Sequence, residues 1–335
     1  MNKLMTVVAA SVCAVSLSGS AVAAEDVSTE KRDLAAEKEA AEGVEEEDDK
    51  AIEAGFDFDF LSAYVWRNAI QTDEMVMQPC IWADWTFYDP FYVGFSVWQN
   101  YDLTDRRHGD LRKGLTETDY NVHVGATVWT SESGNQDLGI ELGHEWYDNQ
   151  FVRNGSGDAY PDTREIYVKL TYNNPFVNVY GQTSWMYEDF GGYKQGVHYE
   201  LGFKREFDVA EFVDIPEETL TFGLDWNVSF GTGHYLNYLY GGTRSGYDEE
   251  GEMQYDGSSA GFGGTTVKAY LAWQVCEHFT VGGVIAYTGV LNGAYRESIG
   301  DQGDDWWDYD EDAGRGNGFY QRDFVWGGLQ AKLDF

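Results

Sequence analysis

Apolar and polar side chains alternate with a period of two along most of the chain after residue 50. Between residues 118 and 130, for example, Val122 and Val124 alternate with Asn121 and His123. Successive side chains of a β-strand point to opposite faces, so the alternation predicts strands with one apolar and one polar face. About twelve such segments are predicted, over residues 56–66, 80–87, 91–101, 118–130, 138–147, 164–172, 176–187, 197–205, 220–230, 265–275, 279–287 and 325–335.

The spacers between these segments alternate in length. The short spacers are 88–90, 131–136, 173–175, 208–218 and 276–278, and the long ones are 67–77, 102–117, 148–163, 188–196, 231–264 and 288–321. Bacterial outer-membrane barrels have short periplasmic turns and long extracellular loops. We therefore expect an all-β fold, a closed antiparallel transmembrane β-barrel of about 12 strands with both termini in the periplasm. Each of the two longest spacers has room for a hairpin, which would raise the count to about 14.

The last predicted strand suits the closing position of such a barrel. One face carries only apolar side chains, which are Val325, Leu329, Ala331, Leu333 and Phe335. We expect this strand to pair with the first strand at Phe56. A terminal aromatic residue on the apolar face also resembles the carboxy-terminal signal of bacterial outer-membrane proteins, which implies outer-membrane lipids and the barrel assembly machinery as partners. A soluble β-sandwich is the alternative that one strand leaves open.

The first fifty residues differ in kind from the rest. Residues 1–24 combine a positive start, an apolar core and the small residues Ala21 and Ala23, which predicts a secretory signal peptide cleaved near residue 23 or 24. Residues 25–50 hold twelve Asp or Glu against four Lys or Arg. Such a segment has too few apolar residues for a core, so we expect an acidic periplasmic tail that is disordered or partly helical. The barrel is then expected over residues 51–335.

Composition limits the partners. The formal net charge is −36, aromatic residues make up 16% of the chain, and the mean hydropathy is −0.46. So acidic a chain will not bind nucleic acid electrostatically. A low mean hydropathy is compatible with a transmembrane barrel, because half of each strand faces the lumen. Beyond the signal no apolar run reaches the eighteen or so residues of a transmembrane helix.

Charged residues on the polar strand faces are the main clue to function. We expect thirteen of them to line the pore: Asp57, Asp59, Asp84, Asp119, Glu141, Glu145, Glu165, Lys169, Glu200, Lys204, Asp225, Lys268 and Lys332. Nine are acids and four are lysines, and rings of carboxylates favour cations in a pore. The pattern predicts a weakly cation-preferring channel for passive diffusion of small polar solutes or ions. The alternative is a non-conducting barrel that acts as an adhesin, envelope anchor or scaffold through its acidic loops and tail.

One segment resembles a known family. Leu61 to Trp85 reads LSAYVWRNAIQTDEMVMQPCIWADW, and it is similar to the opening hairpin of the TorF-type porins. The matching residues are Tyr64, Trp66, Arg67, Ile70, Gln71, Thr72, Asp73 and Pro79. Asn68 and Ala69 stand where Gly is expected next to Arg67. The resemblance implies an outer-membrane β-barrel that forms a passive pore.

No motif predicts an enzyme or a cofactor. The chain has no Gly-x-Ser-x-Gly, His-Glu-x-x-His or Cys-x-x-Cys sequence, and its six histidines are scattered. His198 is expected in the lumen and His144 on the outside, with no serine convincingly placed near either. We therefore expect no catalytic residues, no cofactor and no metal site. Whether the barrel is a monomer or a homo-oligomer remains open, because a lipid-facing stripe and a protomer interface look alike in one sequence.

The long loops are expected to carry exposed charges. The last one contains acidic residues between Asp301 and Asp312, which we expect to bridge divalent ions only loosely, since Ala313 replaces the Gly of a calcium loop. Arg67 is placed in the first outer loop, where it is expected to pair with loop acids or with anionic lipid headgroups. Cys80 and Cys276 are predicted at opposite ends of the barrel, too far apart for a disulfide.

Overall fold

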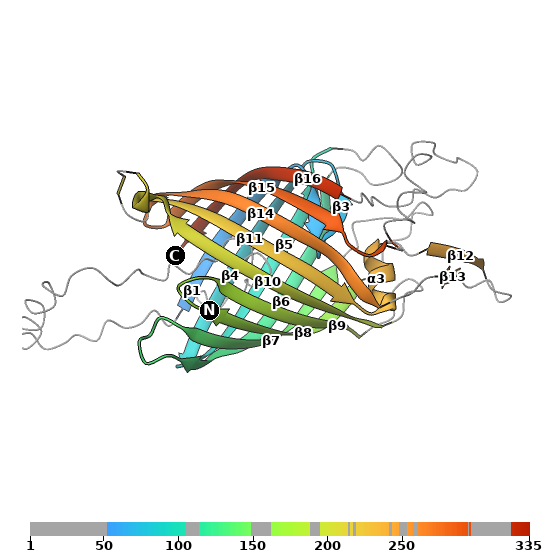
Figure 1. Cartoon of the computed structure of the whole chain (residues 1–335), viewed down its shortest axis with the longest axis horizontal. Coiled ribbons are helices and arrows are strands. Elements are labelled where there is room, and N and C mark those ends of the chain that lie inside the picture. The colour runs from blue at the N-terminus through green and yellow to red at the C-terminus, as the bar shows by residue number, and fades with distance from the viewer. Residues whose placement is uncertain are drawn as a thin grey trace, which may run out of the picture.

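Twelve antiparallel strands form a closed barrel (Figure 1). In this computed structural model the described residues are 52–104, 114–148, 162–187, 195–213, 215–216, 219–240, 243–247, 253–256, 260–293, 295 and 323–335. The barrel strands are β1 (Ile52–Leu61), β4 (Val76–Tyr88), β5 (Phe91–Asp102), β6 (Gly114–Thr130), β7 (Asp137–Asp148), β8 (Thr163–Asn173), β9 (Asn178–Met186), β10 (Gly196–Asp208), β11 (Leu220–Gly231), β14 (Gly261–Cys276), β15 (Phe279–Val290) and β16 (Asp323–Asp334). The predicted fold class and the lower strand count are confirmed.

The remaining elements lie in the connections between wall strands. They are β2 (Tyr64–Trp66), β3 (Ala69–Thr72), the 3-10 helix η1 (Val209–Glu211), α3 (Gly233–Tyr240), β12 (Thr243–Tyr247) and β13 (Met253–Asp256). β12 and β13 pair only with each other. One long spacer thus does contain a hairpin, but that hairpin adds no strand to the wall.

The barrel closes where the sequence predicts. β16 pairs with β1, with Phe56 opposite Leu333 and Phe60 opposite Leu329. The backbone N–H of Phe335 donates to the Ala54 carbonyl over 2.9 Å, which extends the pairing to the last residue. No edge is left open between the first and last wall strands, so their backbone groups are satisfied within the barrel.

The outside of the wall is apolar. Large hydrophobic side chains are exposed on many strands, including Ile81, Val122, Ile140, Leu170, Leu201, Leu224, Leu271, Ile285 and Leu329. Water disfavours so much exposed apolar surface, whereas the hydrocarbon of a bilayer accommodates it. Among the described residues, no helix is long and apolar enough to cross a membrane.

The two ends of the barrel differ. The turn end carries the start of β1, Phe335 and the tight connections, such as residues 89–90 between β4 and β5. The loop end carries the β2-β3 hairpin and α3, as Figure 1 shows. Short turns at one end and longer connections at the other follow the predicted order of spacers.

The first strand is shorter than predicted. Sequence periodicity continues to Trp66, but β1 ends at Leu61 and the chain then leaves the wall. Ala63 and Tyr64 are buried, and the Tyr64 ring lies 5.2 Å from the ring of Trp98 on β5. Packing on side chains of the barrel interior, rather than pairing along the wall, therefore directs residues 62–75.

Candidate pore and its plug

Polar groups of the inner wall face a filled interior. Asp57 lies between the outward Phe56 and Phe58, and the same alternation turns Asp119 and Glu165 inward. Asp57 and Asp119 are each 3% exposed, and Glu165 is 0% exposed. The lumen at these positions is packed with side chains and is not a wide water-filled tube.

An interior cavity of about 220 Å³ remains below the β2-β3 hairpin. Seven of the thirteen residues expected to line the pore line this cavity: Asp59, Asp119, Glu141, Glu145, Lys169, Glu200 and Lys268. The other six are outside its lining, namely Asp57, Asp84, Glu165, Lys204, Asp225 and Lys332. The cavity also receives Trp66, Trp98 and Trp326, which periodicity alone does not bring together.

Several inward acids are compensated by bases. Asp225 Oδ2 lies 3.7 Å from Lys268 Nζ, and the two residues are directly opposite each other on β11 and β14. Asp84 Oδ1 lies 3.0 Å from Nε2 of His123, a residue predicted on the lumen face. The Asp225–Lys268 pair weakens the negative field of the lumen, because the lysine offsets one carboxylate.

Inward tyrosines donate hydrogen bonds to other carboxylates of the lumen. Tyr167 donates to Glu141 over 2.8 Å, and Tyr180 donates to Glu200 over 2.7 Å. Tyr92 and Tyr270 make the same kind of bond, to Glu141 and Glu206. Each hydroxyl supplies a donor to a buried acid, so these acids have fixed orientations.

Each of these tyrosine rings lies over a glycine of the neighbouring strand. A Cβ on Gly202 would lie 2.1 Å from the Tyr180 ring, and one on Gly143 would lie 2.3 Å from the Tyr167 ring. Both glycines are directly paired with their tyrosines. Sequence reasoning missed these contacts. Glycines at inward positions of the strands are visible in the sequence. The tyrosine that covers each of them is known only once the pairing register of the neighbouring strands is known.

The β2-β3 hairpin folds into the lumen at the loop end. Its two-residue turn has Arg67 at φ 48° and Asn68 at φ 65°, between the paired Trp66 and Ala69. Tight hairpin turns of type I′ need positive φ at both central residues. The turn thus forms without the glycine expected there, although a left-handed conformation costs a residue such as Arg roughly 1 kcal/mol.

Arg67 lies in the first loop-end connection, as predicted, but its expected pairing with loop acids or lipid headgroups is wrong. Its side chain is 8% exposed, and Nη2 lies 2.5 Å from Glu165 Oε2 and 3.8 Å from Glu145 Oε2. Its guanidinium also donates to the hydroxyls of Tyr147, over 3.1 Å, and Tyr235. Arg67 pairs with acids of the wall because the hairpin turns inward rather than outward.

Asn68 attaches the same turn to another part of the wall. Its Nδ2 donates to the Gly264 carbonyl over 3.4 Å, and its Oδ1 accepts from Thr266 over 2.5 Å. Gly264 and Thr266 belong to β14, whereas Glu165 belongs to β8, four strands away around the barrel. The hairpin therefore spans the lumen and is fixed on both sides.

An apolar cluster covers the hairpin. Tyr235, Leu236 and Leu239 of α3 are at most 2% exposed and pack in one cluster with Ala69 of the hairpin and Tyr295. Tyr295 and Tyr240 lie with their rings 5.5 Å apart. The hairpin and α3 together form what we call the plug, which fills the loop end of the lumen.

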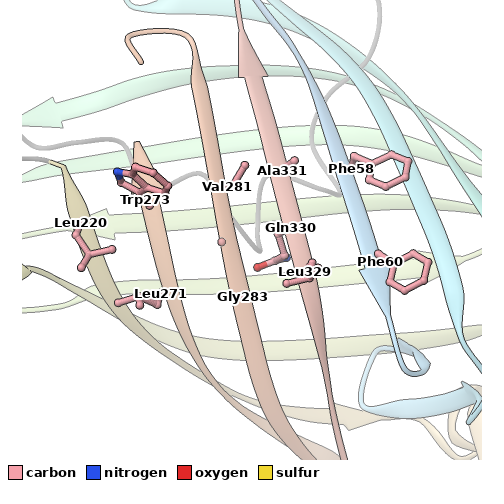
Figure 2. A pocket seen from close by; sticks show the side chains of 11 residues that line it. Phe58, Phe60, Leu220, Leu271, Trp273, Val281, Gly283, Leu329, Gln330 and Ala331 are labelled. Atoms are coloured by element: carbon pink, nitrogen blue, oxygen red, sulfur yellow. The ribbon is translucent and has the colours of Figure 1, made fainter. Parts of the chain in front are cut away.

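A second hollow lies on the outside of the wall. It has a volume of about 730 Å³, and small residues such as Val281, Gly283 and Ala331 form its floor between Trp273 and Phe58 (Figure 2). Its lining is almost wholly apolar. Its position and chemistry suit hydrocarbon and not a polar solute, so the candidate site is the lumen.

The two residues directly opposite the outward His144 in the sheet are aliphatic. His144 is opposite Val122 and Ile166, and its Nε2 lies 2.8 Å from the Tyr187 hydroxyl. Within the described ranges, no group of three His, Cys, Asp or Glu side chains is arranged to hold a metal ion. The acidic loop residues 301–312, the predicted signal peptide and the predicted acidic tail lie outside the described residues.

No protein-family model matches the chain, and no curated protein does either. Several solved structures resemble it in outline, and three of them illustrate the likeness. An outer membrane channel from Pseudomonas putida F1 has 9% identity over 85% of this chain and 96% of that one, with a TM-score of 0.47. The NanC porin has 9% identity over 84% and 98%, with a TM-score of 0.42. Outer membrane phospholipase A from Escherichia coli has 10% identity over 84% and 92%, with a TM-score of 0.40. A likeness of this size carries no argument for a channel over an enzyme.

Proposed function

We propose that this protein is an outer-membrane channel for passive diffusion of small polar solutes or ions, with a weak preference for cations. The observation that carries the proposal is the contrast between the two faces of the wall. The outside is apolar, while the interior cavity is lined by five acids against two lysines of the wall and Arg67 of the hairpin. Carboxylates in a narrow passage attract cations and repel anions.

The plug sets the expected size of the solute. A cavity of about 220 Å³ holds a few water molecules or one small solute. Passage past the hairpin and α3 requires their contacts to loosen, so we expect a low conductance with closed periods. Large oligosaccharides and folded peptides are too big for this route.

The thirteen charged residues named above are proposed to line the pathway, seven of them around the cavity. Residues 1–24 are proposed to be a signal peptide, residues 25–50 an acidic periplasmic tail, and residues 51–335 the barrel. Outer-membrane lipids, the barrel assembly machinery and the permeating solutes are the proposed partners, and a homo-oligomer is compatible with the apolar exterior. The similarity of residues 61–85 to TorF-type porins supports the same role. No enzymatic activity and no cofactor are proposed.

The second candidate is a non-conducting barrel that serves as an adhesin, envelope anchor or scaffold. The plug favours it, because Arg67 and Asn68 fix the hairpin across the lumen from both sides. In that case the acidic loops and tail, rather than the lumen, would contact partners.

Reversal potentials in planar bilayers test the channel. The refolded mature chain is inserted into a planar bilayer that separates solutions with a tenfold difference in potassium chloride concentration. For a cation-preferring pore, we expect the reversal potential to have the sign of the potassium equilibrium potential. Anion preference would contradict the proposed role of the lumen acids. Absence of any current, from protein whose folding is verified by a heat-dependent gel shift, would favour the non-conducting barrel.

A further inference from the structure

The contacts of Arg67 describe a binding site for a guanidinium group. Three groups of the wall and one of α3 form it, and we call them the cage: Glu145 and Tyr147 of β7, Glu165 of β8 and Tyr235 of α3. Glu165 and Glu145 are 0% and 2% exposed. A flat guanidinium with its fork of N–H donors matches such a set of acceptors better than a compact ammonium does.

The cage is ordered by bonds among its own members. Tyr147 donates to Glu145 over 2.6 Å, and Tyr235 donates to Glu165 Oε1 over 2.7 Å. These bonds do not involve the Arg67 side chain, so they do not depend on it for their order. A preorganised site loses little affinity to rearrangement.

The cage also has acceptor capacity that Arg67 does not use. Glu145 Oε1 is buried and has no hydrogen-bond partner among the described residues. Two carboxylates face one guanidinium, and Nη2 of Arg67 is 3.8 Å from Glu145, beyond hydrogen-bond distance. An acceptor left in this state favours a ligand that brings further N–H donors.

We propose that the cage is a guanidinium-binding site which Arg67 occupies in the closed barrel, and that small solutes with a guanidinium group exchange with Arg67 and release the hairpin. The exchange of solutes with Arg67 rests on the proposed channel function, whereas the guanidinium-binding site does not. The exchange is aided by the left-handed backbone at Arg67, because a residue held in that conformation relaxes when its side chain is freed.

Binding is tested first, without any current. Arg67→Ala empties the cage, and calorimetry of the folded, detergent-solubilised full barrel compares methylguanidinium with methylammonium. We expect the variant to bind methylguanidinium at least tenfold more tightly than methylammonium, and Arg67→Ala with Glu165→Gln to lose that preference. Equal affinities, or no binding, would overturn the cage.

Arg164→Ala is the matched control. Arg164 is the neighbour of Glu165 on β8, and its guanidinium lies 5.4 Å from the ring centroid of Trp146, away from the cage. This variant loses one arginine but keeps Arg67 in place, so it is expected to bind methylguanidinium no better than the unmodified protein. Gain of binding in Arg164→Ala would show that the cage is not the site.

Exchange is tested on the unmodified protein, so it does not depend on the folding of a variant. L-arginine and L-lysine are added in turn to a bilayer that contains the barrel, and arginine alone is expected to raise the open fraction severalfold. An equal effect of both amino acids, or no effect of either, overturns the exchange.

The failure of the cage and the failure of the channel can be told apart. Selective binding in a barrel that never conducts refutes the channel and the exchange but keeps the cage. Cation-selective current with no binding to Arg67→Ala refutes the cage and keeps the channel.

Discussion

At the scale of single residues, the lumen is built from pairs that the linear pattern does not reveal. Four inward tyrosines have a glycine opposite the ring and a carboxylate within reach of the hydroxyl: Tyr92, Tyr167, Tyr180 and Tyr270. Tyr180 satisfies both conditions with Gly202 and Glu200. The glycines therefore leave room for the tyrosine rings. A methyl group at such a position displaces the ring and also breaks the hydrogen bond between the tyrosine hydroxyl and the carboxylate.

Gly202→Ala tests this arrangement. The new Cβ would lie 2.1 Å from the Tyr180 ring, so the ring must move away from Glu200. Overpacking of this kind destabilises a protein by about 1–3 kcal/mol, which urea unfolding of the refolded barrel measures.

Gly181→Ala is the control for that change. Gly181 is on the adjacent strand β9, and the nearest atom to its added Cβ is the Glu200 carbonyl oxygen at 3.9 Å. We expect this variant to unfold at nearly the urea concentration of the unmodified protein. Equal destabilisation by the two substitutions would refute the steric argument.

At the scale of elements, the β2-β3 hairpin decides whether the lumen is open. Leu61 of β1 pairs directly with Val76 of β4, so the wall is complete without residues 62–75. The hairpin is an insertion into the interior and not a part of the barrel. Its removal is expected to leave the wall intact.

Replacement of residues 62–75 by an Asn-Gly turn tests this role. A two-residue turn of this kind joins adjacent antiparallel strands without strain. We expect single-channel conductance to rise severalfold, because the hairpin no longer spans the lumen. Planar bilayer recording measures the change, with the heat-dependent gel shift as a check on folding.

Removal of the β12-β13 hairpin is the comparison. It is also a hairpin of a long connection, but its strands pair only with each other. Conductance is expected to stay the same. If both deletions raise the conductance equally, the length of the loop-end connections limits the current and the β2-β3 hairpin has no special role.

At the scale of the whole molecule, charge in the lumen governs which ions pass. The overall formal charge of −36 does not decide this, because it also counts residues that do not belong to the barrel strands. Interior acids act at short range and in a medium that screens them less than water does. Their neutralisation should therefore alter selectivity more than the net charge suggests.

Asp59→Asn combined with Glu200→Gln tests the lumen charge. Both residues line the interior cavity. We expect the reversal potential under a salt gradient to move towards zero by a clear fraction of its original value. Glu132→Gln combined with Glu53→Gln removes the same charge from exposed positions and should change the potential little. An equal shift from both pairs would contradict a role for the cavity.

Much of the architecture could be predicted because its signals are local. Period-two alternation identified the strands, and spacer lengths ordered the two ends. The pairing of the last strand with the first strand followed from the apolar face of the last strand, whereas the register of Phe56 opposite Leu333 came from the structure. The end of β1 could not be found in this way, because alternation continues beyond Leu61 although the chain has left the wall.

The sequence by itself determined a closed barrel of about twelve strands, since alternation and spacing depend on neighbours along the chain, and the structure fixed the count at twelve. Only the tertiary structure decided what fills the barrel. Arg67 and Glu165 are 98 residues apart, and their contact exists because a hairpin turns inward and crosses to the opposite wall. The direction of that hairpin depends on packing against Trp98 and α3, which no local pattern encodes. Contacts between distant segments therefore make the plug and the cage.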